Sequence, residues 1–285
     1  MKITVLMENT SKDPERLAAE HGLSLYIETE KHRILADTGA SDLTWDNAEK
    51  LGVDISSVDT VVISHGHYDH AGGLMGFARR NPDADIYMQR SAGGNFCHGD
   101  RYIGIDREIL LLPRLHLLDG DLRLDDELAV HTGVTGRRLW PRSNIGLSEI
   151  VDGVPVQDRF RHEQFLVIRE GGQLVMISGC AHNGILNLLD RFRELYGTDP
   201  DAVVSGFHMM KREDYTPEET EEILGTARIL AETKTVWYTG HCTGRRAVEL
   251  MAPVMGDRLR EINVGITIEK NDHKTDVLRY NGYNS

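Results

Sequence analysis

Residues 60–73 read TVVISHGHYDHAGG, and this stretch decides the fold. The β-branched run over residues 60–63 is typical of a buried strand in a sheet that is covered on both faces. Three histidines and an aspartate follow it: His65, His67, Asp69 and His70. Ligands of open α/β sheets collect at the carboxyl ends of strands. Imidazoles and a carboxylate on one such turn therefore predict a site for divalent metal ions.

The composition excludes several classes of partner. The chain has 285 residues and a net charge of −13, and this acidity argues against a surface for nucleic acid or membrane, because both need a basic face. No apolar run approaches the length of a transmembrane helix. The three cysteines disfavour a disulfide framework, since their number is odd. We expect a reducing, cytoplasmic location.

Three predicted strands in the second half of the chain also end in glycine-flanked histidines. The strand at 174–178 leads to Cys180 and His182, the strand at 202–205 to His208, and the strand at 235–239 to His241. A predicted helix follows each turn, and the second of these runs from about residue 217 to 231. A helix from about 71 to 80 is predicted after the first motif, and a strand near 262–268 closes the chain. With a predicted hairpin over 23–36, the pattern indicates mixed sheets covered by helices. Residues 88–161 carry short alternating strands, and we interpret them as further sheet plus an insertion beside the active site. One domain over residues 1–285 fits best.

The run His65-Gly66-His67-Tyr68-Asp69-His70 resembles the motif of the metallo-β-lactamase superfamily. The resemblance implies an α/β fold of the αββα type, in which two mixed sheets carry helices on their outer faces and the metal site lies at one edge. The later turns, Gly179-Cys180-Ala181-His182, Gly206-Phe207-His208 and Gly240-His241-Cys242-Thr243-Gly244, resemble the metal-dependent hydrolases related to the 7,8-dihydropterin-6-yl-methyl-4-(β-D-ribofuranosyl)aminobenzene 5'-phosphate synthases.

The resemblance also implies the metal ligands. His65 and His67 serve one ion, while Asp69 and His70 serve a second. Zinc is the favoured metal, with iron or manganese as alternatives. Three further ligands are implied downstream: a histidine, a bridging carboxylate and a final histidine.

The downstream ligands leave alternatives open. For the histidine, His182 is preferred to His162, which stands among charged residues. Cys180 occupies the place of the bridging carboxylate, and it is either a thiolate ligand or an inert buried cysteine. His241 is preferred to His208 as the last ligand. His208 is then a proton donor to the leaving group or a hydrogen-bond partner of the substrate, unless it is a satisfied core histidine.

Asp37 stands in an Asp-Thr-Gly sequence that also resembles the active-site loop of aspartic proteases. That chemistry needs two such aspartates, and the chain has one Asp-Thr-Gly. In the metallo-β-lactamase superfamily an aspartate at this strand end orients a metal-binding histidine, and we assign Asp37 that role.

Basic residues near the turns indicate an anionic substrate. Thr243 and Arg245 open a helix whose free N–H groups are able to hold an anion, so both are predicted to bind substrate. Further basic residues cluster at Arg137, Arg138 and Arg142 and at Lys211 and Arg212. The expected substrate is a small molecule with a phosphate or carboxylate.

The expected function is a dinuclear metal-dependent hydrolase. In it a metal-bound hydroxide attacks an ester, lactone or phosphoester, and Asp69 and His208 take part in catalysis. The first alternative is the pterin synthase, a transferase that releases pyrophosphate. The second is a non-catalytic sensor of a metal or metabolite, because a fold does not determine function. The oligomeric state and the exact substrate stay open.

Overall fold

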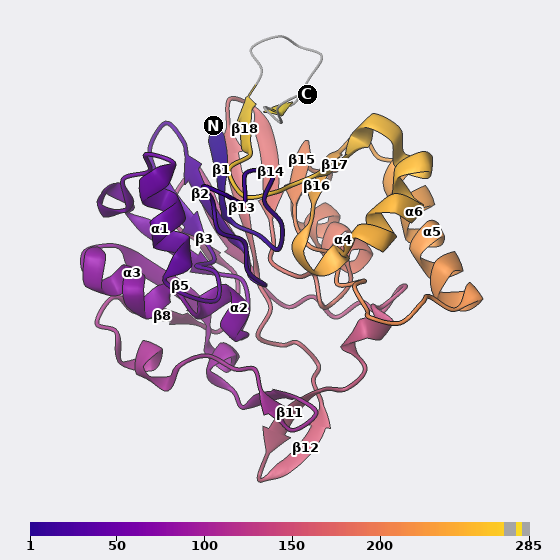
Figure 1. Ribbon diagram of the computed structural model, residues 1–285, viewed down its shortest axis with the longest axis horizontal. Coiled ribbons are helices and arrows are strands. Elements are labelled where there is room, and N and C mark those ends of the chain that lie inside the picture. The colour runs from indigo at the N-terminus through magenta and orange to yellow at the C-terminus, as the bar shows by residue number, and fades with distance from the viewer. Residues whose placement is uncertain (271–277, 281–285) are drawn as a thin grey trace.

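The computed structural model describes residues 1–270 and 278–280, and its strands form two main sheets that face each other (Figure 1). Within these residues the first sheet has eight strands. In order across the sheet they are β19 (Leu278–Tyr280), β18 (Thr267–Lys270), β1 (Lys2–Met7), β2 (Ser24–Glu28), β3 (Arg33–Ala36), β4 (Thr60–Ile63), β5 (Asp85–Gln89) and β8 (Leu115–Leu118).

The second sheet has seven strands in the same described part of the chain. Their order is β17 (Leu259–Glu261), β16 (Val236–Thr239), β15 (Ala202–Val204), β14 (Gln173–Ile177), β13 (Phe165–Glu170), β10 (Leu128–His131) and β9 (Leu122–Arg123). Both sheets are mixed, since β3, β4, β5 and β8 run parallel in the first, and β14 to β17 run parallel in the second.

Helices cover the outer face of each sheet. The first sheet carries α1 (Leu43–Lys50), α2 (Tyr68–Ala71) and α3 (Leu74–Arg80), and the second carries α4 (Ile185–Tyr196), α5 (Pro217–Ala231) and α6 (Arg245–Met255), as Figure 1 shows. Trp45 of α1 and Phe77 of α3 pack in one apolar cluster with β4, while Phe192 of α4 packs in another with β13. The layers are helix, sheet, sheet, helix, and the predicted αββα sandwich is confirmed.

Alternating residues of the central strands enter different apolar clusters. In β13, Leu166 and Ile168 face the space between the sheets, whereas Phe165 and Val167 face the helices. Both faces of such a strand must be apolar because both are covered, which explains why these strands read as continuous hydrophobic runs instead of polar and apolar alternation.

Two predicted element boundaries are wrong. The predicted helix over 71–80 is two helices, α2 and α3, because Gly72 and Gly73 interrupt it. The predicted strand over 262–268 begins too early, because β17 ends at Glu261 and β18 begins only at Thr267. In contrast, α5 begins at Pro217 as predicted, since Thr216 and Glu219 form a capping box at that point.

The strands of region 88–161 belong to three different sheets. Its β8 joins the first main sheet and its β9 and β10 join the second. The remainder forms a small sheet of β6 (Phe96–His98), β7 (Arg101–Tyr102), β11 (Leu147–Val151) and β12 (Val154–Gln157), which projects from one end of the molecule in Figure 1. The small sheet is the part of this region that belongs to neither main sheet.

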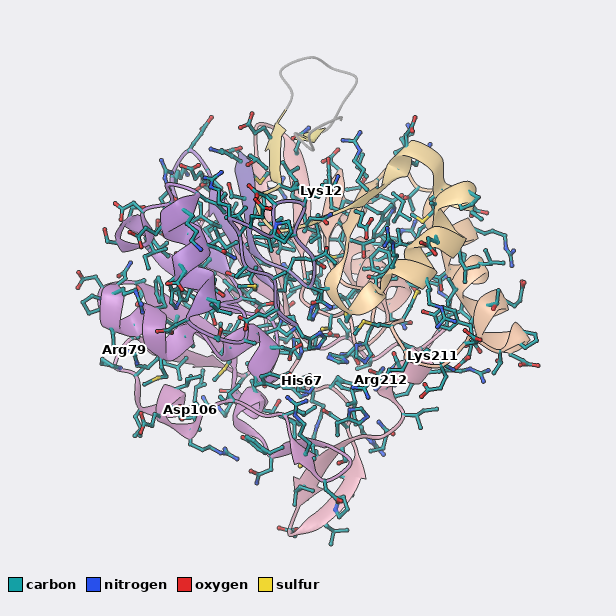
Figure 2. The ribbon with its side chains drawn as sticks, in the orientation of Figure 1. Lys12, His67, Arg79, Asp106, Lys211 and Arg212 are labelled. Atoms are coloured by element: carbon teal, nitrogen blue, oxygen red, sulfur yellow. The ribbon has the colours of Figure 1, made fainter. Side chains whose placement is uncertain are left out.

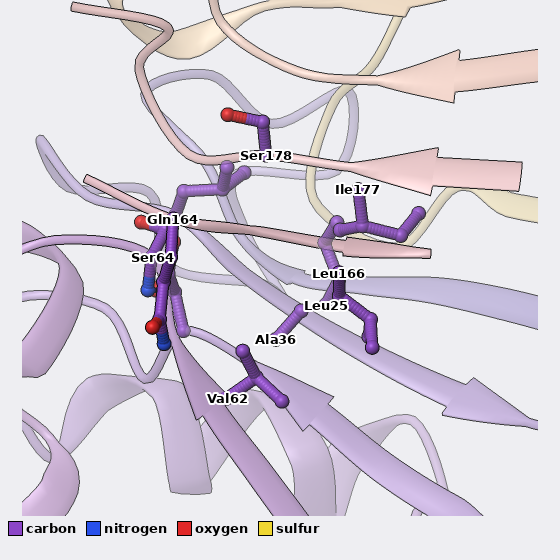
Figure 3. A pocket seen from close by; sticks show the side chains of 10 residues that line it. Leu25, Ala36, Val62, Ser64, Gln164, Leu166, Ile177 and Ser178 are labelled. Carbon is purple, nitrogen blue, oxygen red and sulfur yellow. The ribbon is translucent and has the colours of Figure 1, made fainter. Parts of the chain in front are cut away.

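A small void lies between the two main sheets (Figure 3). Its volume is about 10 Å³, and aliphatic side chains such as Leu25, Val62 and Leu166 line it together with Ser64 and Gln164. This volume is enough for about one water molecule and is too small for a substrate. Among the described helices, none combines the length and the apolarity that crossing a membrane requires.

His32 joins the two main sheets. It lies in the turn between β2 and β3, with Nδ1 2.9 Å from Asp59 Oδ1 and Nε2 2.9 Å from Asp125 Oδ2. Asp59 precedes β4 and Asp125 precedes β10. Burial lowers the pKa of His32, but the hydrogen bonds to Asp125 and Asp59 outweigh burial and raise this pKa above its ordinary value of 6.5.

The raised pKa predicts a pH-dependent contribution to stability. The stabilisation by protonated His32 is fully present below about pH 6.5, the unfolded-state pKa, and is lost as the pH rises through the folded-state pKa. His32→Gln should lower the free energy of unfolding by about 1 kcal/mol near pH 5.5 and by less near pH 8.5. Urea denaturation at the two pH values measures the difference, with exposed His116→Gln as the control. Equal losses at both pH values would contradict this role.

Candidate metal centre

Three buried histidines form a first cluster at the edge of the sandwich. His65 Nε2 lies 3.1 Å from His67 Nδ1 and 3.2 Å from His182 Nε2. His65 and His67 follow β4, and His182 follows β14 in the opposite sheet. The two sheets therefore bring together residues that are 117 positions apart. Figure 2 labels His67 in the middle of the molecule, between the two halves.

The turn after β4 is tightly packed. A Cβ atom on Gly66 would collide with the backbone of Ala92, so glycine is required where the chain passes this loop. The short helix α2 then begins after His67 and presents Asp69 and His70 on its first turn. The HxHxDH spacing thus divides its ligands between an extended segment and a helical one, and the two pairs point to different centres.

A second cluster consists of Asp69, His70, Cys180 and His241. His70 Nε2 lies 3.1 Å from both Cys180 Sγ and His241 Nε2, and His241 Nε2 lies 3.3 Å from Asp69 Oδ2. All four side chains are buried, and their ligand atoms lie within 4.8 Å of one another. Cys180 and His241 come from the turns after β14 and β16.

The hydrogen bonds of the histidine Nδ1 atoms fix which ring nitrogen carries the proton. His70 Nδ1 donates to Asp37 Oδ2 at 2.7 Å, and His182 Nδ1 donates to Asn144 Oδ1 at 2.9 Å. His65 Nδ1 lies 2.9 Å from Ser64 Oγ, whose own proton is donated to Asp37 at 2.7 Å. Each of these rings therefore carries a proton on Nδ1, and in a neutral ring Nε2 presents a lone pair.

These lone pairs face one another, which favours a cation between them. Two unprotonated nitrogens about 3 Å apart share no hydrogen bond and repel each other. The close Nε2 pairs are His65 with His182, and His70 with His241. Imidazole, carboxylate and thiolate donors, held by buried hydrogen-bond partners on the far side of the rings, are what zinc and similar divalent ions bind. The residues therefore fit two metal ions.

The pKa values of the first cluster keep its rings neutral. Burial holds the pKa of His65 and of His182 well below 6.5, and burial lowers the pKa of His67 to about 3. His70 differs: burial lowers its pKa, but Asp37 and Asp69 outweigh burial and raise it to about 10. The carboxylates of Asp37 and Asp69 stabilise a positive charge at His70. A metal cation bound at Nε2 would supply that positive charge in place of the second proton.

Cys180 lies between the two clusters. Besides the contact with His70, its Sγ is within 4.8 Å of ring nitrogens of His182 and His208. Burial raises the pKa of the Cys180 thiol, and a cation nearby would lower it again. The sequence left Cys180 open between a ligand and an inert core residue. Its position between both clusters is compatible with a ligand and with a bridging donor.

Asp37 and His162 both make hydrogen bonds to the segment that carries the first ligands. Asp37 accepts hydrogen bonds from Ser64 N at 2.7 Å and from His70, so its carboxylate is used in orienting ligands. His162 Nδ1 accepts a hydrogen bond from Gly66 N, and its Nε2 lies 3.0 Å from Asp158 Oδ2. Both nitrogens of His162 are therefore engaged, whereas His182 Nε2 faces His65 and lies in the same group of candidate ligand atoms as His67.

His208 lies beside the first cluster and outside both ligand sets described above. Its ring centroid is 4.1 Å from that of His182, and neither ring nitrogen has a hydrogen-bond partner among the described residues. Backbone φ is 48° at His208 and 50° at His241, in the left-handed region that non-glycine residues rarely adopt. Strain of this kind at two strand ends is typical of functional turns.

Thr243 and Arg245, which are predicted to bind substrate, make contacts within the protein. The Thr243 hydroxyl accepts from Phe207 N at 2.8 Å and contacts Thr239 Oγ1, so it fastens two turns together. The Arg245 side chain is 85% exposed and pairs with Glu249. Neither residue lines the cleft described next. The predicted helix does begin here, at Arg245, but the side chains of Thr243 and Arg245 contact other residues of the protein.

A cleft of about 840 Å³ opens beside His208. Its apolar walls include Trp140 and Tyr215, and its four cationic side chains, Arg101, Arg142, Lys211 and Arg212, outnumber three glutamates. Arg142 is paired with Glu222 and Lys211 with Glu219. In the part of the chain that the structure describes, Arg101 and Arg212 form no ion pair, although Arg101 lies over the ring of Tyr68.

Sequence reasoning missed several partners of the ligands. Asn144 and Ser64 orient His182 and His65, and the buried carboxylate of Glu163 accepts hydrogen bonds from His182 N and Asn183 N. Asn9 and His21, in the loop after β1, contact the second cluster. None belongs to a motif. The predicted basic residues Arg137 and Arg138 bind Asn183 and Asp190 and do not line the cleft.

Known proteins resemble this chain in sequence and in fold. The family model of the metallo-beta-lactamase superfamily matches residues 18–143. Tm1679, described as a metal-dependent hydrolase of the beta-lactamase superfamily, is 30% identical, with a TM-score of 0.81, and the match covers 95% of this chain and 100% of that one.

Two relatives from Methanocaldococcus jannaschii also match most of the chain. The 7,8-dihydropterin-6-methyl-4-(beta-D-ribofuranosyl)-aminobenzene-5'-phosphate synthase is 26% identical, over 94% of this chain and 96% of its own length. An uncharacterised protein is 28% identical over 86% of this chain and 92% of its own. With an identity of 30% over the full length of Tm1679 and the same arrangement of sheets, the chain belongs to the metallo-β-lactamase superfamily.

Proposed function

We propose that the protein is a dinuclear metal-dependent hydrolase of anionic small molecules. The observation that carries the proposal is the pair of adjoining clusters, in which seven side chains from separate strand ends converge on two centres. When bound, two divalent ions supply Lewis acidity and lower the pKa of water. Zinc is the favoured ion, with iron or manganese as alternatives, because imidazole, carboxylate and thiolate donors suit all three.

Asp69 and His208 are assigned the proton handling of the reaction. Burial alone would raise the pKa of Asp69, but His70 and His241 hold it well below its ordinary value. An ionised Asp69 accepts a hydrogen bond from the attacking water and orients it. His208 lines the cleft with both ring nitrogens unpaired within the described residues, so it is placed to give a proton to the leaving group.

The cleft supports an anionic substrate of modest size. Its volume of about 840 Å³ lies within the range of small-molecule sites. The chain has a net charge of −13, whereas the lining of this cleft has more cationic than anionic side chains. Arg101 and Arg212 would bind the phosphate or carboxylate, and the apolar walls would contact the remainder. The scissile ester, lactone or phosphoester would then lie beside His208.

A transferase is the second candidate, and the 26% identical synthase is the observation that favours it. Incubation with a pterin methyl diphosphate and an aminobenzene riboside phosphate separates the two activities, because only the synthase releases pyrophosphate. A third candidate is a sensor without catalysis. Tight binding of one metabolite, without turnover of any ester, lactone or phosphoester in a broad panel, would favour it.

Asp69→Asn tests the hydrolase proposal. The amide keeps the size of the side chain but removes its charge, so the rate of hydrolysis of the best substrate in a panel should fall on the order of 10²- to 10⁴-fold. Steady-state assays on zinc-loaded protein measure the rate, and circular dichroism checks the fold. Undiminished hydrolysis by the variant would refute the mechanism.

Asp37→Asn tests whether Asp37 orients a ligand of the second metal ion. Asparagine tolerates the left-handed backbone of Asp37, whose φ is 59°. Its amide nitrogen would nevertheless oppose one of the donors that Asp37 now accepts, and the affinity for the second ion should fall roughly 10- to 100-fold. Equilibrium dialysis with metal analysis measures it, with exposed Asp119→Asn as the control. Unchanged uptake of two ions would show that Asp37 does not orient a ligand.

Arg212→Ala tests the anion site. Arg212 lines the cleft, and Figure 2 labels Arg79 far from Arg212, at the left edge of the molecule. Loss of the Arg212 guanidinium should raise the KM for an anionic substrate about 10-fold and leave kcat nearly unchanged, because the contact is made equally in the ground and transition states. Arg79→Ala is the matched control. An equal rise of KM for a neutral analogue would argue against recognition of the anion.

A further inference from the structure

The loop between β1 and β2 contacts the second cluster through three side chains. Glu8 Oε1 accepts a hydrogen bond from His241 N, and Glu8 Oε2 accepts from Thr10 N at 2.6 Å. Asn9 and His21 are close to the ligand side chains themselves. Glu8 and Asn9 are 233 and 232 positions away from His241 in the sequence.

Asn9 fixes the tautomers of two imidazoles. Its Oδ1 accepts from His241 Nδ1 at 2.8 Å, and its Nδ2 lies 3.3 Å from His241 O and 3.2 Å from His21 Nδ1. Because the amide nitrogen only donates, His21 Nδ1 is the acceptor and the proton of His21 is on Nε2. His241 has the opposite tautomer, with a proton on Nδ1 and a lone pair on Nε2 that faces the cluster.

His21 is placed against two ligands at once. Its Nε2 lies 3.3 Å from Asp69 Oδ2, and its ring stacks on His241 with centroids 4.8 Å apart and an interplanar angle of 30°. The side chain is 45% exposed, so it lies at the solvent boundary of the cluster. His21 therefore restrains Asp69 with a hydrogen bond and His241 with its ring.

We propose that Asn9 and His21 are positioning residues that set the affinity of the second cluster for its metal ion. The inference rests on the proposed dinuclear centre. Hydrogen-bond partners of ligands fix the orientation of donor atoms before the ion arrives. The first cluster has separate partners, Ser64 for His65 and Asn144 for His182. The Asn9–His21 pair acts on Asp69 and His241 alone, and so it sets the second ion's affinity independently of the first.

Stepwise cobalt binding by the full-length protein tests this inference. Asn9→Ala and His21→Ala should each lower the affinity for the second equivalent roughly 10- to 100-fold and leave the first unchanged. Equilibrium dialysis with metal analysis gives both affinities. The charge-transfer band from the Cys180 thiolate to cobalt adds a spectroscopic record, and it should appear only at higher free cobalt in the variants. His21→Gln, whose amide is able to donate to Asp69, should restore part of the affinity.

Matched controls separate the possible results. His116→Ala removes an exposed histidine that pairs with Asp85 and should leave both affinities at the wild-type values. If the wild-type protein binds two ions and both variants, Asn9→Ala and His21→Ala, bind them with the same affinities, this inference alone is overturned. Equal loss of both ions would overturn it as well, since the effect would not be specific. Uptake of a single ion by the wild-type protein would overturn the dinuclear proposal together with this inference.

Discussion

The candidate metal centre depends on imidazole nitrogens that face one another at close range and that, in neutral rings, both present lone pairs. His65 and His182 oppose each other in the first cluster, as His70 and His241 do in the second. Such pairs have no mutual hydrogen bond, and they are unfavourable unless a cation lies between them. Each pair has one member from the turn after β4 in the first sheet and one from a turn of the second sheet. The centre is thus also the junction at which the two sheets meet at the edge of the sandwich.

The surroundings of the clusters explain how this junction persists in the folded protein. Ser64 and Asp37 form a continuous buried hydrogen-bond network with His65 and His70. Networks of this kind are stable only when every member has its partner, and they then hold side chains in a single orientation. Left-handed backbone at His208 and His241 indicates that the sandwich supplies enough stability to keep two turns in unfavourable conformations.

The sequence predicted those parts of the molecule that depend on local patterns. A β-branched run followed by HxHxDH is a strong local signal, and glycine-flanked histidines after later strands pointed to the same edge of the sandwich. A helix beginning near Pro217 was also predicted, and the capping box of Thr216 and Glu219 is the local signal at that point. By contrast, the strands of region 88–161 are only two to five residues long, and nothing in so short a pattern indicates which of three sheets each will join.

Contacts between distant loops lay beyond sequence reasoning. Asn9, Asn144 and His21 stand in segments without periodicity, and their function is evident only when the chain is folded. Thr243 and Arg245 illustrate the converse, because a helix start offers an anion site only when its side chains are not already paired.

The distribution of the ligands along the chain also determines the order in which the centre is assembled. His65, His67, Asp69 and His70 leave the ribosome together, whereas His182 and His241 follow more than a hundred residues later. A nascent chain can therefore present four donors long before either cluster is complete. Because a partial donor set binds metal weakly, tight retention must await translation and docking of the second sheet. Tight metal binding at the proposed centre therefore requires that synthesis has passed residue 241.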